Sequence, residues 1–358
     1  MLTIYPETHD QKAVEFCQRF LSDSAPPRYV LGRNEYAASI AAAVDVDGFI
    51  DEFTHERFFL GKPIVPIVEV PKEGLVVSTA VGVLPSAALS RLKECGLTCL
   101  DYFAFLRLSG LPLENVPMLS DGSADIERNW RMYQWTYDLL EDDGSKEVLE
   151  RLLNFRASGA LSWMSGFEHA PDRQYFEDFV KLRPGEVFVD AGGFDGETSV
   201  AFIERCPAYR SVHLFEPDST NMELARSNLS GCRGVHFHAT GLAASRGTMR
   251  FSPGGGSASK VTETGDVEIP VDAIDNVIEE PISFVKMDIE GAEGIALAGA
   301  KSHISRDHPK LAVSCYHNVD DIWKLPEQVV AIRDDYSLHV RHYTEGTEET
   351  VMYFIPRS

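Results

Sequence analysis

The stretch VFVDAGGFDGETS, residues 187–199, constrains the fold of this chain more than any other segment. Its apolar start predicts a strand buried on both faces of a parallel sheet, and Asp190 ends that strand. A turn with three glycines follows: Gly192, Gly193 and Gly196. Glycine tolerates a positive φ and lets a ligand approach the backbone, and the helix expected from Glu197 presents free N–H groups. This order is typical of a loop that binds a nucleotide cofactor.

Two later strands also end in acids. The run HLFEPDS, residues 213–219, places a second apolar strand about 25 residues further on and ends it with Glu216. In nucleotide-binding βαβ units, an acid at this spacing accepts hydrogen bonds from two ribose hydroxyls. The run FVKMDIEGAEG, residues 284–294, predicts a third strand with three acids at its carboxyl end: Asp288, Glu290 and Glu293. Acids grouped at one edge of a sheet indicate a site.

The glycine turn does not have the pattern of a dehydrogenase. The glycines do not form Gly-x-Gly-x-x-Gly, and no Tyr-x-x-x-Lys pair is present to act as the acid in hydride transfer. An acid before the glycines suits a cationic cofactor, because Asp190 could organise the loop around a ligand that carries an amino group and a sulfonium. S-adenosylmethionine fits that description.

Seven segments, in this order, resemble one known family: QYF (174–176), VFVDAGGFDGETS, LFEPD (214–218), VKMDIEGAE (285–293), PKLAVSCYHNVDDIW (309–323), RHY (341–343) and TVMYF (350–354). Over about half of its length the chain is therefore similar to the FkbM-type methyltransferases, class I S-adenosylmethionine-dependent enzymes that mostly methylate hydroxyls. The resemblance implies the following cofactor-binding residues: Asp190, Ala191, Gly192, Gly193, Phe194, Gly196, Glu216, Pro217 and Asp288.

The expected fold class is α/β, with a seven-stranded, doubly wound, Rossmann-like sheet in a methyltransferase domain at 181–358. Strands are expected near 187–190, 211–215, 235–239, 283–288, 310–315, 337–342 and 350–355. The last two strands lack a helix between them and should therefore pair antiparallel. Residues 247–252 and 267–271 predict an inserted β-hairpin.

A smaller α/β domain is expected at 1–119. Residues 29–43 predict a strand, a turn and a helix, and further strands are expected in 44–53, 64–68 and 75–78. This pattern resembles the Rossmann-like modules of glycan- and sugar-nucleotide-modifying proteins. Only Gly32 remains of their glycine loop, so a scaffold or docking role is favoured over a working nucleotide site at Asp51 and Glu52.

A helical bridge or lid is expected between the two domains, at 120–180. Apolar residues recur at three- and four-residue spacing in 125–140 and 145–155. These helices indicate a bridge and a homodimer surface. The aromatic-rich segment 161–178 either folds over the cofactor or contributes ordinary core residues.

Transfer of a methyl group from a sulfonium to a hydroxyl requires a base, because the pKa of an alcohol lies far above neutrality. Candidates lie where the fourth to sixth strands should end: Asp288, Glu290, His317 and His342. His317 is the first choice, because it directly follows the strand LAVSCY and an ordinary histidine pKa of about 6.5 suits proton acceptance. Asp320 or Asp321 could orient its ring. Alternatively, His317 is a loop histidine bonded to the backbone.

The remaining histidines have other expected roles, and a metal ion is an alternative to the base. His342 lies inside a predicted strand beside Arg341 and is expected to bind substrate, whereas three strand histidines are expected to be structural: His213, His236 and His238. Asp288, Glu290 and His317 could instead hold a divalent ion that lowers the hydroxyl pKa. No short ligand motif requires one, so no metal is expected.

Charge and composition narrow the acceptor. A formal charge of −22 disfavours nucleic acid, and no stretch approaches the roughly 20 apolar residues of a membrane span. No leader pattern begins the chain, so a cytoplasmic enzyme is expected. The favoured function is O-methylation of a sugar, glycan or polysaccharide precursor. Alternatives are a polyketide-type natural-product hydroxyl, or a non-catalytic cofactor-binding scaffold of glycan assembly.

Overall fold

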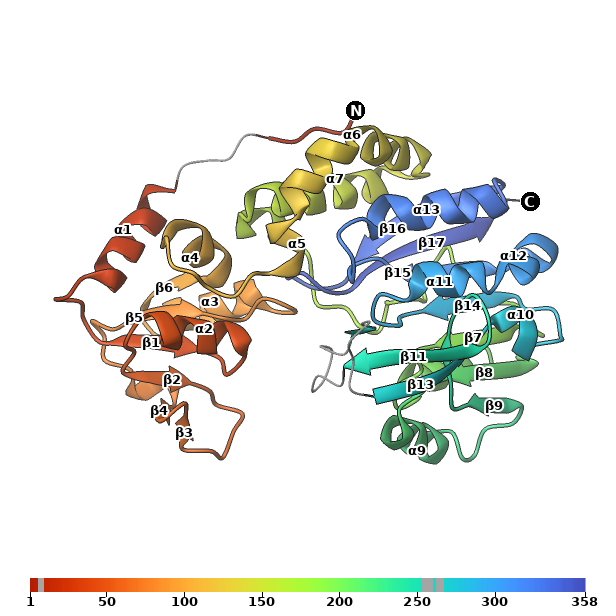
Figure 1. Ribbon diagram of the computed structural model, residues 1–358, viewed down its shortest axis with the longest axis horizontal. Coiled ribbons are helices and arrows are strands. Elements are labelled where there is room, and N and C mark those ends of the chain that lie inside the picture. Colours follow the sequence, from red (N-terminus) through yellow and green to blue (C-terminus); the bar gives the residue numbers. More distant parts are fainter. Residues whose placement is uncertain (6–9, 253–259, 262–266, 358) are drawn as a thin grey trace. The chain divides into compact units, whose positions relative to one another are not determined.

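A computed structural model describes residues 1–5, 10–252, 260–261 and 267–357 (Figure 1). The chain forms two compact units, each made of separate segments. Unit 1 contains 1–130, 147–170 and 343–349, and unit 2 contains 131–146, 171–342 and 350–358. The segment predicted as a bridge thus contributes to both units.

Unit 1 is built on a six-stranded sheet with the order β3-β4-β2-β1-β5-β6. Its strands are β1 Arg28–Leu31, β2 Gly48–Ile50, β3 Phe58–Phe59, β4 Lys62–Val65, β5 Leu75–Ser78 and β6 Thr98–Asp101. All pair in parallel except β3, which is antiparallel to β4. The expected α/β pattern is therefore present, and the sheet also contains β3 and β6, which were not predicted from the sequence.

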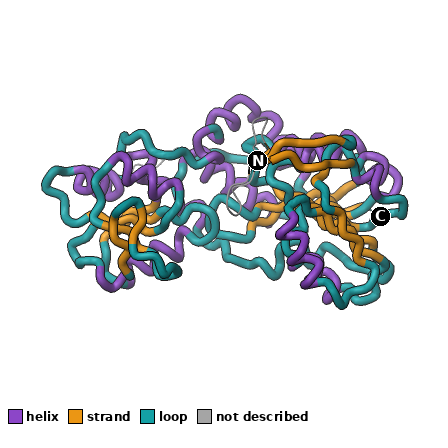
Figure 2. The backbone as a smooth tube through the Cα atoms, turned by 60° about the horizontal axis from the view of Figure 1, so that its bottom comes forward, coloured by secondary structure: helices purple, strands orange, loops and turns teal. Residues whose placement is uncertain are grey.

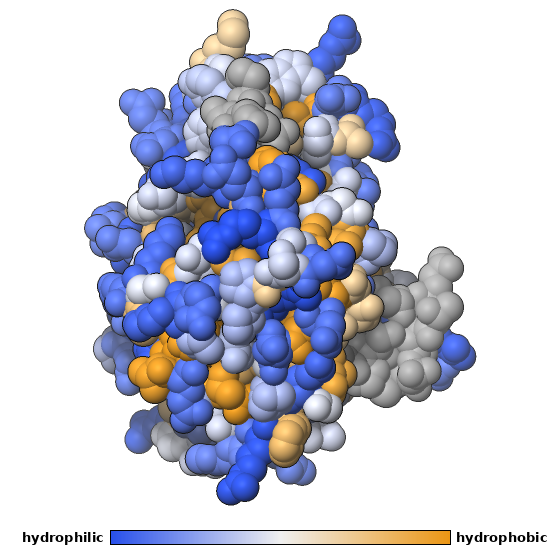
Figure 3. Space-filling view, turned by 90° about the vertical axis from the view of Figure 1, so that its left-hand side faces the viewer, coloured by the Kyte–Doolittle hydropathy of each residue, from blue (hydrophilic) through white to orange (hydrophobic). Residues whose placement is uncertain are grey.

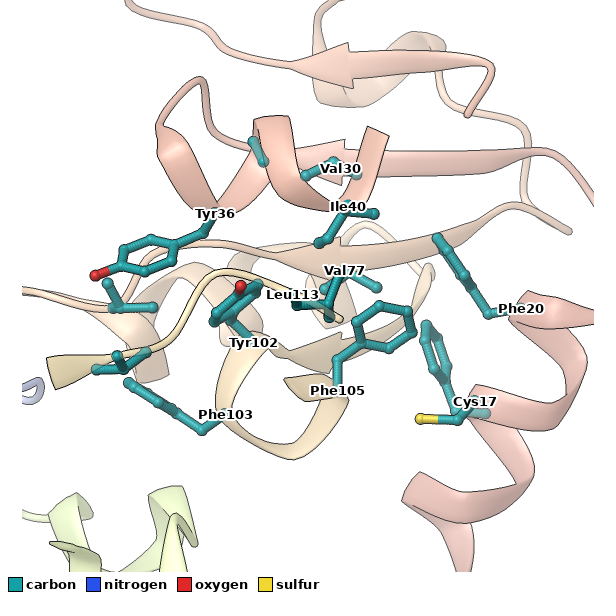
Figure 4. Close-up of a cluster of buried hydrophobic side chains, with 14 of the residues drawn as sticks. Cys17, Phe20, Val30, Tyr36, Ile40, Val77, Tyr102, Phe103, Phe105 and Leu113 are labelled. Carbon is teal, nitrogen blue, oxygen red and sulfur yellow. The ribbon is translucent and has the colours of Figure 1, made fainter. Parts of the chain in front are cut away.

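Helices cover this sheet and close the core of unit 1. They are α1 Gln11–Leu21, α2 Glu35–Ala43, α3 Pro85–Glu94 and α4 Tyr102–Leu108. Figure 4 shows side chains of α1, α2 and α4 meeting over the sheet. Phe20 packs edge-to-face on Phe105 at 5.1 Å between ring centroids, and Tyr36 packs on Tyr102 at 4.9 Å. Such aromatic pairs add about 0.5–1.5 kcal/mol each to the stabilisation from burial alone.

The face of the protein drawn in Figure 3 is mainly hydrophilic. Figure 3 shows hydrophobic residues interspersed among charged and polar ones. Several large apolar side chains are nevertheless exposed at or near the β3–β4 edge: Phe53, Phe58 and Leu60. No helix in the described ranges is long and apolar enough to cross a membrane.

The helical segment between the sheets contains α5 Pro117–Ser120, α6 Gly122–Leu139 and α7 Asp143–Ser158. Helix α6 leaves helical geometry at Asn129, beside the boundary between the units. Within unit 2, Asp142 accepts hydrogen bonds from Ser145 N at 2.6 Å and from the Arg341 guanidinium, and its carboxylate lies 2.5 Å from His339 Nδ1. Asp142 therefore ties the start of α7 to strand β16.

Unit 2 contains the seven-stranded sheet, with the order β16-β17-β15-β14-β7-β8-β9. The strands are β7 Val187–Ala191, β8 Ser211–Phe215, β9 Val235–His238, β14 Phe284–Met287, β15 Lys310–Ser314, β16 Tyr336–His342 and β17 Thr350–Pro356. Only β17 runs antiparallel to its neighbours β15 and β16. The predicted fold class and the antiparallel pairing of the last two strands are confirmed.

The order of the strands reverses beside β7, and this reversal creates the site. From β7 the chain moves outward through β8 to β9, and later from β14 to β15 on the other side. Right-handed crossovers then place the connecting helices on opposite faces. The helices are α8 Glu197–Arg205, α9 Ser219–Asn228, α10 Ile274–Val277, α11 Glu293–Ala298, α12 Lys301–Asp307 and α13 Asp321–Ile332 (Figures 1 and 2). The ends of β7, β8, β14 and β15 meet at one edge.

A second, four-stranded sheet is inserted after β9. Its order is β10-β13-β11-β12, with β10 Gly241–Leu242, β11 Gly247–Ser252, β12 Lys260–Val261 and β13 Val267–Asp272. Strands β11 and β13 pair antiparallel. The predicted inserted hairpin is therefore confirmed.

Candidate active site

The glycine loop after β7 is packed against the ends of two neighbouring strands. Gly192 has φ +74°, and a Cβ at this residue would lie 1.8 Å from the main-chain oxygen of Asp288. A Cβ at Gly193 would lie 2.4 Å from Leu214 of β8. The N–H groups of both glycines donate to Phe215 O at 3.0 Å. Glycine is therefore required here by close packing as well as by backbone conformation.

A buried ion pair between Asp190 and Lys286 supports this loop. Asp190 has no exposed surface, and its carboxylate accepts a hydrogen bond from Ser199 Oγ at 2.7 Å and lies 3.1 Å from Lys286 Nζ. Lys286 also donates to Gly192 O at 2.7 Å. Burial alone would lower the pKa of Lys286, but the charges of Asp190 and Asp288 raise it overall. Asp190 thus holds the loop through Lys286, a residue that was not predicted as part of the site.

Glu216 lies at the end of β8, next to the same loop. One carboxylate oxygen accepts from Phe194 N at 3.0 Å, and the other accepts from Asp218 N at 2.8 Å. Burial raises the pKa of Glu216. Phe194, at φ +45°, is largely exposed, whereas Ala191 is buried and Pro217 is half-buried. Backbone N–H groups therefore orient the carboxylate expected to bind ribose.

Two tyrosines converge on Asp288, just beyond β14. Tyr175 donates its hydroxyl to Asp288 Oδ2 at 2.7 Å, and Tyr316 donates to Oδ1 at 3.1 Å. Burial would raise the pKa of Asp288, but the charge of Lys286 and then that of His317 lower it. Tyr175, also at positive φ, belongs to the aromatic segment predicted either to cover the cofactor or to fill the core. The sequence offered QYF as the signal for Tyr175, but its partner is more than 100 residues away.

His317, beyond β15, lies among three acids. Its Nδ1 is 3.0 Å from Glu293 Oε1, and its Nε2 is 3.5 Å from Asp288 Oδ1 and 3.6 Å from Glu290 Oε2. Burial alone would lower the pKa of His317, but the adjacent Glu293 carboxylate and the charges of Asp288 and Glu290 raise it to about 9. The ordinary value of about 6.5 assumed from the sequence therefore does not apply to the free protein.

Glu293, and neither of the two aspartates considered from the sequence, holds the His317 ring. Asp320 forms an ion pair with Lys324, and Asp321 accepts a hydrogen bond from Asn318 N at 2.8 Å. Burial and the charge of Glu293 raise the pKa of Asp321 to about 7. Glu293 is fully buried and also accepts from Ile289 N at 2.9 Å, which fixes the oxygen that faces His317.

His342 lies apart from this cluster, at the end of β16. Its Nδ1 is 2.9 Å from Thr350 Oγ1, and both residues are buried. Thr350 begins β17, which separates β16 from β15 in the sheet. Of the predicted catalytic residues, the structure therefore brings together Asp288, Glu290 and His317. His342 is on β16, and β17 lies between it and β15, the strand that precedes His317.

The three strand histidines stack on one another. His213 lies between His236, at 4.7 Å between ring centroids, and His238, at 5.4 Å. Burial lowers the pKa of His238 to about 4. The three rings therefore pack against one another beside strands β8 and β9.

The carboxylates beside the glycine loop suit a ligand that carries both a positive charge and hydroxyl groups. Glu216 lies on one side of the glycine loop, and Asp288 lies on the other with its side chain 21% exposed. Helix α8 begins directly after Gly196, whose φ is +87°. Carboxylates can hold the ribose diol and the amino and sulfonium groups of S-adenosylmethionine, so these residues fit that cofactor.

Comparison with known proteins supports the same assignment. Residues 190–342 match the family model described as the methyltransferase FkbM domain. The structure is similar to that of methyltransferase FkbM from Methylobacillus flagellatus KT, over 96% of this chain and 93% of that chain, with 25% identity and a TM-score of 0.76. An rRNA methylase from Streptococcus thermophilus matches 49% of this chain and 90% of its own, with 14% identity and a TM-score of 0.35.

No curated protein sequence matches the chain significantly. The family model spans the glycine loop, Glu216 and the acids around His317, and the structural match extends over both units. Residues 190–342 therefore belong to a methyltransferase domain of the FkbM family, and this fold implies S-adenosylmethionine as the cofactor.

Proposed function

We propose that this protein methylates a hydroxyl group and that His317 accepts the hydroxyl proton. The observation that carries the proposal is the pair between Glu293 and His317. Glu293 holds Nδ1 at 3.0 Å, which leaves Nε2 turned toward Asp288 and Glu290 beside the cofactor loop. A buried acid that orients an imidazole is the arrangement by which histidine acts as a general base.

The raised pKa of His317 is compatible with this role. At about 9 it keeps the ring protonated near neutrality in the free protein. Bound S-adenosylmethionine supplies the methyl group on a positively charged sulfur. A positive charge near His317 disfavours its protonated form and lowers its pKa. His317 then accepts the proton through Nε2, while Glu293 stabilises the resulting imidazolium through Nδ1.

Asp288 and its two tyrosines have a positioning role in this proposal. Tyr175 and Tyr316 restrain the Asp288 carboxylate through their hydroxyls, and Lys286 offsets its charge from below. Asp288 can therefore stay ionised near a cation. Glu290, whose side chain is 30% exposed and lies 3.6 Å from His317 Nε2, binds the acceptor hydroxyl in this proposal. His342 is buried at the end of β16, and in this proposal it shapes the part of the site that binds the acceptor.

The metal alternative uses the same residues. Ligand atoms of Asp288, Glu293 and His317 lie within 4.8 Å of one another. The predicted set with Glu290 is also compact, because Nε2 of His317 is 3.6 Å from Glu290 Oε2. A divalent ion there would lower the pKa of the acceptor hydroxyl directly.

The proposed acceptor is a sugar hydroxyl in a glycan, nucleotide sugar or polysaccharide precursor. Its support is the resemblance to enzymes that mostly methylate hydroxyls, together with the Rossmann-like unit 1. A polyketide-type hydroxyl is the second candidate, and a non-catalytic scaffold is the third. We further propose a cytoplasmic protein that acts on a small molecule or glycan rather than on nucleic acid, and that dimerises through α6 and α7.

Methyl transfer from isotopically labelled S-adenosylmethionine tests the proposal. Pools of nucleotide sugars, glycans and polyketide-type alcohols are incubated with the full chain, and labelled products are identified by mass spectrometry. Label on a sugar oxygen supports the proposal, and label on nitrogen or carbon overturns the hydroxyl assignment. Tight cofactor binding without labelled product in any pool favours the scaffold.

A further inference from the structure

A second cluster of side chains that could bind a metal ion lies beside strands β8 and β9 of unit 2. His213 and His236 are direct partners in the parallel register of these strands. Their rings are stacked, with 4.7 Å between centroids and 20° between planes. Both imidazoles therefore project from the same face of the sheet. His213 is buried, whereas His236 is exposed to solvent.

A carboxylate from a distant part of the chain completes the cluster. Glu280 precedes β14 and places Oε1 3.1 Å from His213 Nε2. Ser211 donates its hydroxyl to the same oxygen at 2.6 Å, so the carboxylate is held in place. One ligand atom from each of His213, His236 and Glu280 lies within 4.8 Å of the other two.

These distances suit a tetrahedral ion after small side-chain rotations. Bonds of about 2.0–2.2 Å to nitrogen and oxygen place neighbouring ligands of a tetrahedral zinc ion roughly 3.3 Å apart. The distance between Glu280 and His213 is already close to this value. Exposed His236 can turn toward the ion, and a water molecule can fill the fourth position.

The ring of His213 has a support on its other nitrogen. His213 Nδ1 lies 3.1 Å from His238 Nε2. His238 is itself stacked on Phe215, with ring centroids 4.4 Å apart. A hydrogen bond at the second ring nitrogen is the usual support of a metal-bound histidine, because it fixes the tautomer and the orientation of the ring.

We propose that His213, His236 and Glu280 form a zinc-binding site that is separate from the methyl-transfer site. Two imidazoles and one carboxylate favour Zn²⁺ over Mg²⁺ or Ca²⁺, which prefer oxygen ligands. The ion links edge strand β9 to β8 and to the loop before β14. Its role in this proposal is to stabilise that edge of the sheet.

Zinc titration of the metal-free full chain tests the site by calorimetry. We expect one Zn²⁺ per chain, and a loss of at least tenfold in affinity for His236→Gln and Glu280→Gln. Since His236 is exposed, its replacement should leave the fold intact, as checked by circular dichroism. The matched control is His317→Gln, which removes the histidine of the other candidate cluster and should leave this affinity unchanged.

Cobalt provides a second readout. Co²⁺ bound by two imidazoles and a carboxylate in a tetrahedral site should give strong visible bands in the wild type and in His317→Gln, but not in His236→Gln. Zn²⁺ should also raise the melting temperature of the wild type and leave that of His236→Gln unchanged. Wild-type affinity in both His236→Gln and Glu280→Gln, or loss of binding only in His317→Gln, overturns the proposal.

Discussion

In both sheets of this chain, a glycine follows one strand and an acidic residue follows its neighbour at the same edge. The two acidic residues have different hydrogen-bonding partners. In unit 1, Gly32 follows β1 at φ +112°, and Asp51 follows β2. Arg33, from the loop itself, binds Asp51 at 2.6 Å. In unit 2, Glu216 occupies the corresponding place after β8, and its carboxylate accepts hydrogen bonds from Phe194 N and Asp218 N.

This difference changes what each carboxylate can bind. An arginine within hydrogen-bonding distance of Asp51 competes with any hydroxyl for the carboxylate. The loop after β1 is also packed against the residue that follows β5, because a Cβ at Gly32 would lie 2.4 Å from Thr79 Oγ1 and Asn34 donates to Thr79 O at 2.9 Å. Strand order alone therefore does not predict a ligand site. The partners of the acid after the second strand distinguish the two units.

The largest effect that tests this comparison is expected at the two glycines. Gly192→Ala places a Cβ against the Asp288 carbonyl at 1.8 Å, so the loop must move. We expect no measurable binding of S-adenosylmethionine by calorimetry. Gly32→Ala, the matched change in unit 1, should leave this affinity unchanged. Equal, wild-type affinity in both variants would show that the β7 loop does not bind the cofactor.

The next largest effect is expected at His317. His317→Ala should reduce turnover on the order of 10²–10⁴-fold and leave cofactor affinity nearly intact, because it removes the base and not the loop. Glu293→Gln should change the pH profile of turnover, since it removes the charge that orients the ring. If chelator abolishes wild-type activity and Mg²⁺ or Mn²⁺ restores it, the metal alternative replaces the general base.

A smaller loss is expected at Glu216. Glu216→Ala should weaken S-adenosylmethionine binding by about 1.5–3 kcal/mol, because hydrogen bonds to a charged group are lost. Asp51→Ala, the corresponding change in unit 1, should have no effect on this affinity. Titration calorimetry measures both variants. An unchanged dissociation constant in Glu216→Ala would remove Glu216 from the site.

The smallest effect concerns stability and pH. Folding raises the pKa of His317 from 6.5 to about 9, so its protonated form stabilises the fold. This contribution is complete below about pH 6.5 and is lost as the pH rises through about 9. The unfolding free energy of the wild type relative to His317→Ala should therefore fall by about 1–2 kcal/mol between about pH 6 and pH 10. Urea titrations measure it, with exposed His55→Ala of unit 1 as the control; a constant difference would contradict the raised pKa.

The elements of the large sheet were predictable because each one is specified locally. Buried parallel strands appear as short apolar runs, and glycines with a following acid mark the turn after β7. Glu216 could be found for the same reason, since its spacing from the loop is set by one helix and one strand. The antiparallel pairing of β16 and β17 followed from the short segment between them.

The partners within the site could not be predicted, because they meet through tertiary packing. Tyr175 donates a hydrogen bond to Asp288, which lies 113 residues further along the chain. Lys286 forms an ion pair with Asp190 of the neighbouring strand. Glu293 was visible as an acid, but its contact with His317 depends on how α11 begins beside β15. The pKa of His317 depends on all three surrounding charges, and no sequence pattern encodes their distances.

The division of each unit into separate segments affects how the protein can be made and cut. Residues 343–349 belong to unit 1, where Glu345 N donates to Val83 O at 2.9 Å and Glu345 Oε2 accepts from Ala87 N at 2.9 Å. On the ribosome, unit 1 can acquire these bonds only after residues 343–349, and therefore most of unit 2, have been synthesised. A single proteolytic cut cannot release either unit as a complete piece. A truncation that removes residues 343–349 therefore also removes part of unit 1.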